Sequence, residues 1–198
     1  MVRGQYVFCW GPDFGWRGSL EKCGGGALLD MGYHTVDMIN WLVGLPDEVY
    51  SMTGKSARPH TPHPYETEDS AITLLKYSNG TMGYLLNSWV SSPKEERVIL
   101  HETEGVLEAD WSGLSLYTPQ GDVVEHVKKE DVETSPNYPY RSQLEHFAAA
   151  VLENKVDYLC SGRENLKNMA LIEAAYRSAD TGRPQSPKRI LQKAKVEF

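Results

Sequence analysis

Three pairs of β-rich segments, each joined by a short turn, dominate residues 70–127 and restrict the folds open to this chain. The turns are Asn-Gly at 79–80, Glu-Gly at 104–105 and Gln-Gly at 120–121. Asn-Gly is the dipeptide preferred where both turn residues need a positive φ, and strands joined by such short turns run antiparallel. The pattern therefore predicts an antiparallel sheet of about six strands, to which the opening segment "VRGQYVFC", residues 2–9, adds another.

Helical spacing of apolar residues marks three further segments. In residues 27–43 the apolar side chains fall on one broad arc, and Gly44 provides a stop signal. Residues 140–153 repeat the helical pattern, and a capping box at 161–164 begins a third helix that runs to Gly182. The apolar stripe of the second helix consists of Leu144, Phe147, Ala148, Val151 and Leu152.

These elements together predict an α+β fold, with a large, open, predominantly antiparallel sheet and helices packed on one face. The 198 residues suit a single domain spanning residues 1–198. The uncovered, half-apolar sheet face is a natural assembly surface, so we expect a homo-oligomer through it. Because the chain opens almost directly in a strand, we also expect it to be part of a longer protein.

Charge and cysteine usage exclude several classes of partner. The net charge of −7, without any run of Lys or Arg, argues against nucleic acid. The three cysteines, Cys9, Cys23 and Cys160, are odd in number and widely spaced, which suits neither a disulfide framework nor a zinc site. The N-terminal segment lacks an apolar run long enough for a signal peptide. We therefore expect a cytoplasmic protein with no membrane partner.

The segment "CGGGALLDMGYHTVDMINWLVG", residues 23–44, holds the most unusual group of polar residues. Asp30, His34, Asp37 and Trp41 lie within roughly 60° of one another around the predicted helix, opposite its apolar arc. A solvated helix face would explain this stripe as well as a functional site does. Three chemistries compete with that interpretation: a phosphate-binding loop, a metal site and an acid/base pair.

The sequence does not match a phosphate-binding loop. GGGALLD does not match G-x-G-x-x-G, and it follows an aromatic loop rather than a parallel strand, so the dinucleotide-binding context is missing. A metal site fits better, since Asp30, His34 and Asp37 could offer one nitrogen and two oxygens to a divalent ion. Most zinc sites are richer in His or Cys, and our preferred interpretation therefore contains no metal.

An acid/base pair is the third chemistry that the spacing allows. A carboxylate one helical turn before a histidine can accept a hydrogen bond from one ring nitrogen, which fixes the tautomer and raises the basicity of the other nitrogen. His34 could then remove a proton from a substrate hydroxyl near neutral pH, with Asp30 as its partner. The glycines would let a ligand approach the start of the helix, although a flexible hinge explains them equally well.

The same segment is similar to the motif G-G-G-x-x-x-D-x-G-x-H-x-x-D of the glucose–fructose oxidoreductase/inositol dehydrogenase/MocA-type (Gfo/Idh/MocA) oxidoreductases. The resemblance continues through "EDSAITLLKYSNGTMGYLLNSW", "ETEGVLEAD", "YRSQLEHFAAAV" and "NLKNMALIEAAYRSADTGRP", nearly the whole chain in order. Members of that family have an N-terminal Rossmann domain that binds NAD(P), followed by a C-terminal α/β domain of the dihydrodipicolinate-reductase type. This chain resembles the second domain alone, because the dinucleotide fingerprint and the family's E-K-P segment are missing.

The resemblance implies a site at the cleft between the two domains. His34 would be the general acid/base at a substrate hydroxyl or carbonyl, and Asp30 would orient it. The hydride would pass to or from an NAD or NADP nicotinamide held by the absent domain. Six further positions follow from the resemblance: Trp16, Arg17, Tyr138 and Tyr140 as substrate contacts, and Gly25 and Gly26 on the nicotinamide side of the cofactor.

We therefore expect the substrate-binding and oligomerisation domain of an NAD(P)-dependent oxidoreductase acting on a sugar, a polyol or a related hydroxy compound. This chain alone should lack dehydrogenase activity, because hydride transfer needs a cofactor held in place. Two alternatives stay open. One is a stand-alone binding module without catalysis, and the other is a metal-dependent isomerase or lyase built on Asp30, His34 and Asp37.

Overall fold

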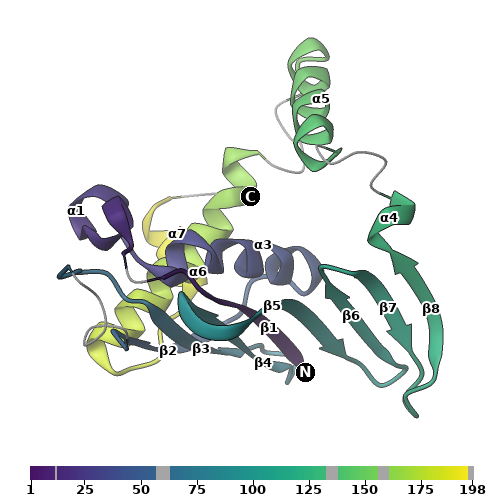
Figure 1. The fold of residues 1–198 in the computed structure, drawn as a ribbon, viewed down its shortest axis with the longest axis horizontal. Coiled ribbons are helices and arrows are strands. Elements are labelled where there is room, and N and C mark those ends of the chain that lie inside the picture. Colours follow the sequence, from purple (N-terminus) through teal and green to yellow (C-terminus); the bar gives the residue numbers. More distant parts are fainter. Residues whose placement is uncertain (12, 57–62, 133–137, 156–160, 196–198) are drawn as a thin grey trace.

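A computed structural model describes residues 1–11, 13–56, 63–132, 138–155 and 161–195. In this part of the chain eight strands form one open sheet in the order β2-β3-β4-β1-β5-β6-β7-β8 (Figure 1). The strands are β1 (Val2–Cys9), β2 (Glu48–Gly54), β3 (Ser70–Lys76), β4 (Met82–Ser88), β5 (Val90–His101), β6 (Val106–Asp110), β7 (Gly113–Tyr117) and β8 (Val123–Lys128).

The helices are a 3₁₀ turn, η1 (Gly15–Gly18), and α1 (Leu20–Cys23), α2 (Ala27–Asp30), α3 (Gly32–Leu42), α4 (Lys129–Val132), α5 (Tyr138–Leu152), α6 (Gly162–Thr181) and α7 (Pro187–Lys193). The side chain of Ser161 accepts a hydrogen bond from the backbone N–H of Glu164, which confirms the predicted start of α6. Gly182 ends that helix with a φ of 63°.

The predicted antiparallel sheet is confirmed, with one exception at its centre. Strand β1 pairs with β5 antiparallel and with β4 parallel, while the other described pairings are antiparallel. The three predicted turns join β3 to β4, β5 to β6 and β7 to β8. In the first of them only Gly80 has a positive φ, and Oδ1 of Asn79 accepts a hydrogen bond from the backbone N–H of Thr81 at 3.0 Å.

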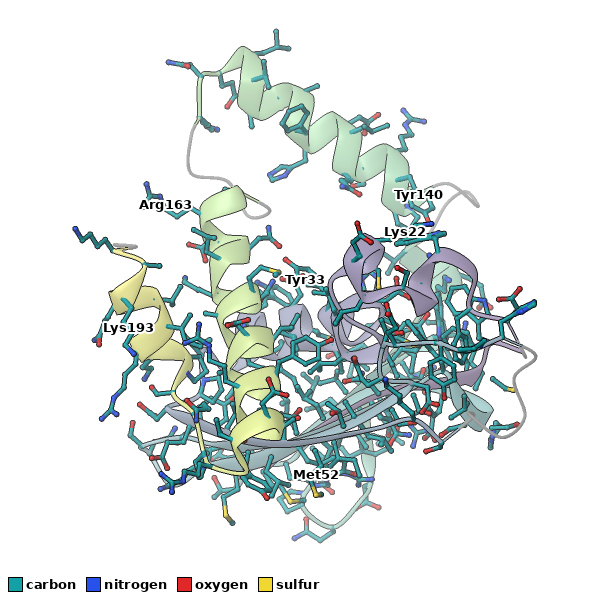
Figure 2. All side chains as sticks on the ribbon, turned by 90° about the vertical axis from the view of Figure 1, so that its left-hand side faces the viewer. Lys22, Tyr33, Met52, Tyr140, Arg163 and Lys193 are labelled. Atoms are coloured by element: carbon teal, nitrogen blue, oxygen red, sulfur yellow. The ribbon has the colours of Figure 1, made fainter. Side chains whose placement is uncertain are left out.

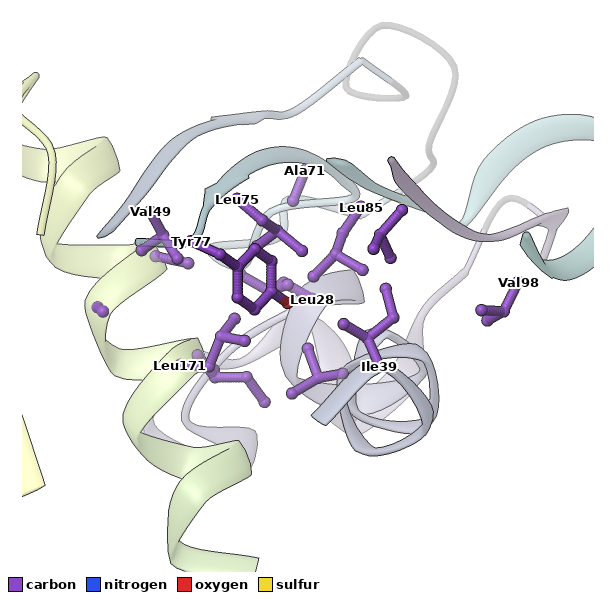
Figure 3. Close-up of a cluster of buried hydrophobic side chains, with 14 of the residues drawn as sticks. Leu28, Ile39, Val49, Ala71, Leu75, Tyr77, Leu85, Val98 and Leu171 are labelled. Atoms are coloured by element: carbon purple, nitrogen blue, oxygen red, sulfur yellow. The ribbon is translucent and has the colours of Figure 1, made fainter. Parts of the chain in front are cut away.

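Helices α3 and α6 cover one face of the sheet and enclose the core between them and the strands (Figure 3). Apolar positions alternate along the strands, so that every second side chain points to this face. The buried members of the arc predicted for residues 27–43 are Leu28, Met31, Thr35, Val36 and Ile39. The opposite face of the sheet carries no helix in Figures 1 and 2, where Met52 projects away from α6.

One continuous helix over residues 27–43 was the wrong expectation, because the structure divides it at Met31 into α2 and α3. The backbone tightens there, and the N–H of His34 bonds to the carbonyl of Met31 at 3.1 Å. Gly32 permits the new direction, since a Cβ at this position would lie 2.8 Å from Oδ1 of Asn87 on β4. The break lets α3 approach the sheet closely and places Asp30 and His34 on either side of a bend.

Helix α5 does not pack on the sheet, although its apolar stripe leads one to expect it there. It stands apart from the α3–α6 layer in Figure 1. Its side chains Leu144, Phe147, Val151 and Leu152 are 51–86% exposed. In the described part of the chain no helix has the length and apolar character needed to cross a lipid bilayer.

Substituting Leu85→Ala on β4 should destabilise the fold by about 2–5 kcal/mol, because it leaves a cavity among fully enclosed neighbours. Leu85 is 0% exposed, whereas Leu152 at the end of α5 is 86% exposed. Leu152→Ala is thus the control, expected to change the free energy of unfolding by less than about 1 kcal/mol. Urea unfolding measures both, and equal losses would contradict the packing described here.

Candidate active site

Asp30 and His34 lie at the bend between α2 and α3, on the helix-covered face of the sheet. Strand β1 runs beneath them: a Cβ at Gly4 would lie 2.7 Å from the side chain of Thr35 on α3. Tyr6, two residues further along β1, points to the same face. Its ring centroid is 6.4 Å from that of His34, whose side chain is exposed. The imidazole is therefore accessible to a ligand on its exposed side, and the ring of Tyr6 lies on its other side.

Arg17 from η1 joins the site through Asp30. Its Nε lies 3.3 Å from both carboxylate oxygens of Asp30. The guanidinium stacks over the rings of Trp10 and Trp16, at 4.6 Å from each centroid, which holds it against the carboxylate. The structure thus brings together Trp16, Arg17 and Asp30, three of the residues that the sequence analysis singled out. Among the described residues, however, no hydrogen bond joins Asp30 to His34.

Two cavities flank this group. One of about 230 Å³ is lined on the α2 side by Trp16, Arg17, Gly25, Asp30 and others. A second of about 90 Å³ lies between α3 and the sheet and is lined by His34 together with Glu96 and Trp111. A cavity of about 690 Å³ beside β8 and α5 contains none of the predicted site residues. The two smaller cavities therefore define the candidate site.

Tyr6 and Glu96 belong to the site, and sequence reasoning missed both. They are register partners on β1 and β5. Burial raises the pKa of Tyr6, as do the charge of Glu96 and a hydrogen bond to it. Burial also raises the pKa of Glu96, while the positive charges of His34 and Lys94 oppose that rise. Because side chains alternate along a strand, the contact of Gly4 with α3 implies that Tyr6 also points to the covered face. The pairing of Tyr6 with Glu96 could not be predicted in this way, since it depends on the register of β1 and β5 in the folded sheet.

Glu68 was also missed, and it organises the glycine entrance to α2. Its buried carboxylate accepts hydrogen bonds from the backbone N–H of Gly26 at 2.9 Å and of Leu28 at 3.0 Å, and from the hydroxyl of Tyr176 at 2.8 Å. A Cβ at Gly26 would lie 1.8 Å from the backbone oxygen of Glu68. Close approach of the protein's own chain thus explains why this position holds glycine.

Glu68→Gln should change how stability depends on pH. Burial raises the pKa of Glu68, although its hydrogen bonds oppose this. A raised folded-state pKa contributes stability below the unfolded-state pKa, and this contribution is lost as pH rises through the folded-state value. The unfolding free energy of wild type minus that of Glu68→Gln should therefore fall from about pH 4 to about pH 7. Urea unfolding across this range, with Glu66→Gln at an exposed neighbour as control, would contradict the expectation if the difference rose.

The remaining predicted residues lie outside this group. Tyr140, on α5, is 71% exposed and lines neither of the two cavities. The side chain of Tyr138 is outside the described residues. Asp37 accepts a hydrogen bond from Asn168 on α6 at 2.6 Å. Within the described ranges no three His, Cys, Asp or Glu side chains are grouped so that they could hold a metal ion.

Comparison with known proteins identifies the family of this chain. The family model described as "Oxidoreductase family, C-terminal alpha/beta domain" (GFO_IDH_MocA_C) matches residues 1–186. D-apiose dehydrogenase of Rhizobium rhizogenes is 27% identical over 167 residues, which are 78% of this chain and 46% of that protein. The oxidoreductase YrbE of Bacillus subtilis is 27% identical over 176 residues, covering 83% and 49%. The chain spans about half the length of these curated relatives.

Solved structures share the fold over nearly the whole chain. Levoglucosan dehydrogenase in complex with NADH has a TM-score of 0.82 at 18% identity, covering 93% of this chain and 57% of that one. GenD2 from gentamicin A biosynthesis, in complex with NAD, has a TM-score of 0.70 at 26% identity, covering 93% and 54%. With the family match over residues 1–186, the conclusion is direct: this chain belongs to the C-terminal α/β domain family of the Gfo/Idh/MocA oxidoreductases.

Proposed function

We propose that this chain is the substrate-binding domain of a two-domain, NAD(P)-dependent oxidoreductase that acts on a sugar, a polyol or a related hydroxy compound. The observation that carries the proposal is the exposed imidazole of His34 beside a cavity-lining Arg17–Asp30 ion pair. Support also comes from relatives: D-apiose dehydrogenase is similar over 78% of this chain, and GenD2 was solved with NAD.

His34 is the general acid/base in this proposal. During oxidation of a hydroxyl its neutral ring accepts the hydroxyl proton, and during reduction the charged ring returns it. Arg17 and Asp30 offer a donor and an acceptor from one fixed pair, which suits neighbouring hydroxyls of a polyol. Trp16, 54% exposed beside them, adds an apolar ring face against which a sugar's C–H groups can pack.

A nicotinamide dinucleotide, NAD or NADP, would supply the hydride acceptor or donor when bound. The residues of the site fit such a cofactor. His34, Arg17 and Asp30 can transfer a proton and form hydrogen bonds, but none of them can accept a hydride, so another group must do so. Within this chain Gly25 and Gly26 would face the nicotinamide end, and Gly25 lines the cavity that contains Asp30. The dinucleotide itself would be held by a Rossmann domain outside these 198 residues.

The experiment that tests the proposal compares two proteins. The full-length gene product containing this domain and the 198-residue chain are both assayed for NAD⁺ and NADP⁺ reduction against a panel of sugars and polyols. We expect turnover with the longer protein only. No turnover in either, combined with sugar binding to the chain detected by calorimetry, would replace the dehydrogenase with a stand-alone binding module.

Assembly through the uncovered sheet face is part of the same proposal. Four large apolar side chains on β2, β3 and β4 are exposed there, namely Met52, Ile72, Leu74 and Met82, at 42–67%. Introducing a charge with Leu74→Glu should convert the oligomer to a monomer, because a carboxylate buried in an apolar interface lacks a partner. Light scattering at micromolar concentration measures the mass, and a wild-type monomer would contradict the proposed interface. Glu48→Gln, an exposed charge removal on the same face, is the control.

A further inference from the structure

The imidazole of His34 has a carboxylate neighbour that the proposed chemistry does not yet use. Asp30, expected to be its partner, is held at 3.3 Å by Arg17. Glu96 on β5 instead shares with His34 the lining of the cavity of about 90 Å³ between α3 and the sheet. The two groups are close enough that the charge of His34 opposes the burial-raised pKa of Glu96. Glu96 is thus the carboxylate on the sheet side of the ring.

The surroundings of Glu96 leave one oxygen available for a bridging group. The hydroxyl of Tyr6 is hydrogen-bonded to the Glu96 carboxylate. Oε2 of Glu96 is buried and has no hydrogen-bond partner among the described residues. A buried carboxylate oxygen without a hydrogen-bond partner destabilises the folded state. A cavity of about 90 Å³ that is lined in part by polar side chains, among them His34 and Glu96, has room for a water molecule that would satisfy it.

We propose that Glu96 is the positioning residue of His34. A water in this cavity accepts a hydrogen bond from the second ring N–H of His34 and donates one to the Glu96 carboxylate, while Asp30 stays paired with Arg17. The proposal rests on the acid/base role of His34 given above. When His34 takes the substrate proton on one nitrogen, the negative charge of Glu96 favours the resulting imidazolium. This stabilisation is electrostatic, and it does not require His34 to transfer a proton to Glu96.

Other charged and titratable groups face the same space and must be considered. They are Tyr6 on β1, Asp30 on α2, Lys94 and Arg97 on β5, Asp110 at the end of β6 and Lys129 on α4. Arg97 lies 3.0 Å from Glu108, and Asp110 accepts from the backbone N–H of Ser112 at 2.7 Å. The ammonium groups of Lys94 and Lys129 stack over Trp111, at 4.6 and 4.7 Å. These contacts orient the other groups toward neighbours of their own and leave Glu96 with the free oxygen.

The test follows the ring ¹⁵N resonances of His34 by NMR in the isotopically labelled 198-residue chain, because these resonances report which ring nitrogen carries the proton. Glu96→Gln should shift them toward the other neutral tautomer, because an amide is a weaker acceptor for the second N–H than a carboxylate is. The matched control is Glu104→Gln, the same charge removal at an exposed position of the turn between β5 and β6, outside this cavity. Asp30→Asn should produce a smaller shift than Glu96→Gln. A shift no larger than the control's, or smaller than that of Asp30→Asn, would overturn the proposal.

A reciprocal variant protects the test if Glu96→Gln does not fold. His34→Gln alters an exposed side chain and should raise the pKa of Glu96 further, since the opposing positive charge is gone. The carboxyl ¹³C resonance of Glu96 measures this, and an unchanged titration would count against the coupling. Neither readout needs cofactor or turnover, so failure here leaves the dehydrogenase proposal standing.

Discussion

Replacing His34 by Gln in the full-length gene product should lower kcat by about 10²–10⁴-fold, the contribution typical of a positioned general acid/base. Glutamine keeps a polar side chain of similar reach but cannot accept and return a proton near neutral pH. Because the side chain is exposed, the substitution removes little packing, and the melting temperature should stay close to that of wild type. Steady-state kinetics with circular dichroism on the same samples separates the two effects.

The control for this variant is His126→Gln. His126 is an exposed histidine on β8, bonded through Nδ1 to the hydroxyl of Ser115 at 2.8 Å, and it lines neither cavity of the candidate site. It should retain wild-type kcat. If His34→Gln turned over at the wild-type rate, the polar stripe of α2 and α3 would be a solvated helix surface, and the chain's role would reduce to binding.

Gly26→Ala should destabilise the domain by more than about 4 kcal/mol, enough to exhaust much of a typical domain's stability. The added Cβ would lie 1.8 Å from the backbone oxygen of Glu68, and backbone atoms cannot move away as a flexible side chain can. Relief of this overlap would separate the start of α2 from Glu68 and break the 3.0 Å bond from the N–H of Ala27 to that oxygen. Thermal unfolding and soluble yield measure the loss.

Gly162→Ala is the matched control for this substitution. Gly162 is the first residue of α6, and no atom lies within 4 Å of the position its Cβ would take. Alanine there should be neutral or stabilising by up to about 1 kcal/mol, because it reduces the freedom of the unfolded chain. Equal melting temperatures for Gly26→Ala and wild type would show that the glycine entrance has space to spare.

The strands and most of the core were predictable because they depend on short-range patterns. Turn dipeptides and alternating residues located the hairpins, and the arc from Leu28 to Ile39 identified the buried side of the first helical segment. The division at Met31 was not predictable, since it depends on Asn87, a residue 55 or more positions away that meets Gly32 only in the folded sheet. A helical projection assumes a straight axis, and it cannot show such a bend.

The candidate site divides in the same way. Asp30, His34, Arg17 and Trp16 came from one contiguous stretch and from a resemblance, and the structure places Asp30, Arg17 and Trp16 around one cavity. The sequence spacing gave the wrong partner for His34. Asp30 precedes it by one helical turn in the sequence, but in the structure the carboxylate of Asp30 is paired with Arg17. Glu68 and Glu96 reach the site through a long loop and through strand pairing, which leave no local signal in the sequence, and the pairing of Tyr6 with Glu96 likewise depends on the sheet register.

The central position of β1 has a consequence for the order in which this domain can form during synthesis. Val2 pairs with Gly83 on one side and with Leu100 on the other. A ribosome therefore delivers the middle strand of the sheet first, and its two partners follow only some 80 and 100 residues later. Until then the strand has unpaired edges on both sides, and closing such long loops is slow. We expect nascent chains that end before β5 to depend on chaperones, and the sheet to assemble in one late step.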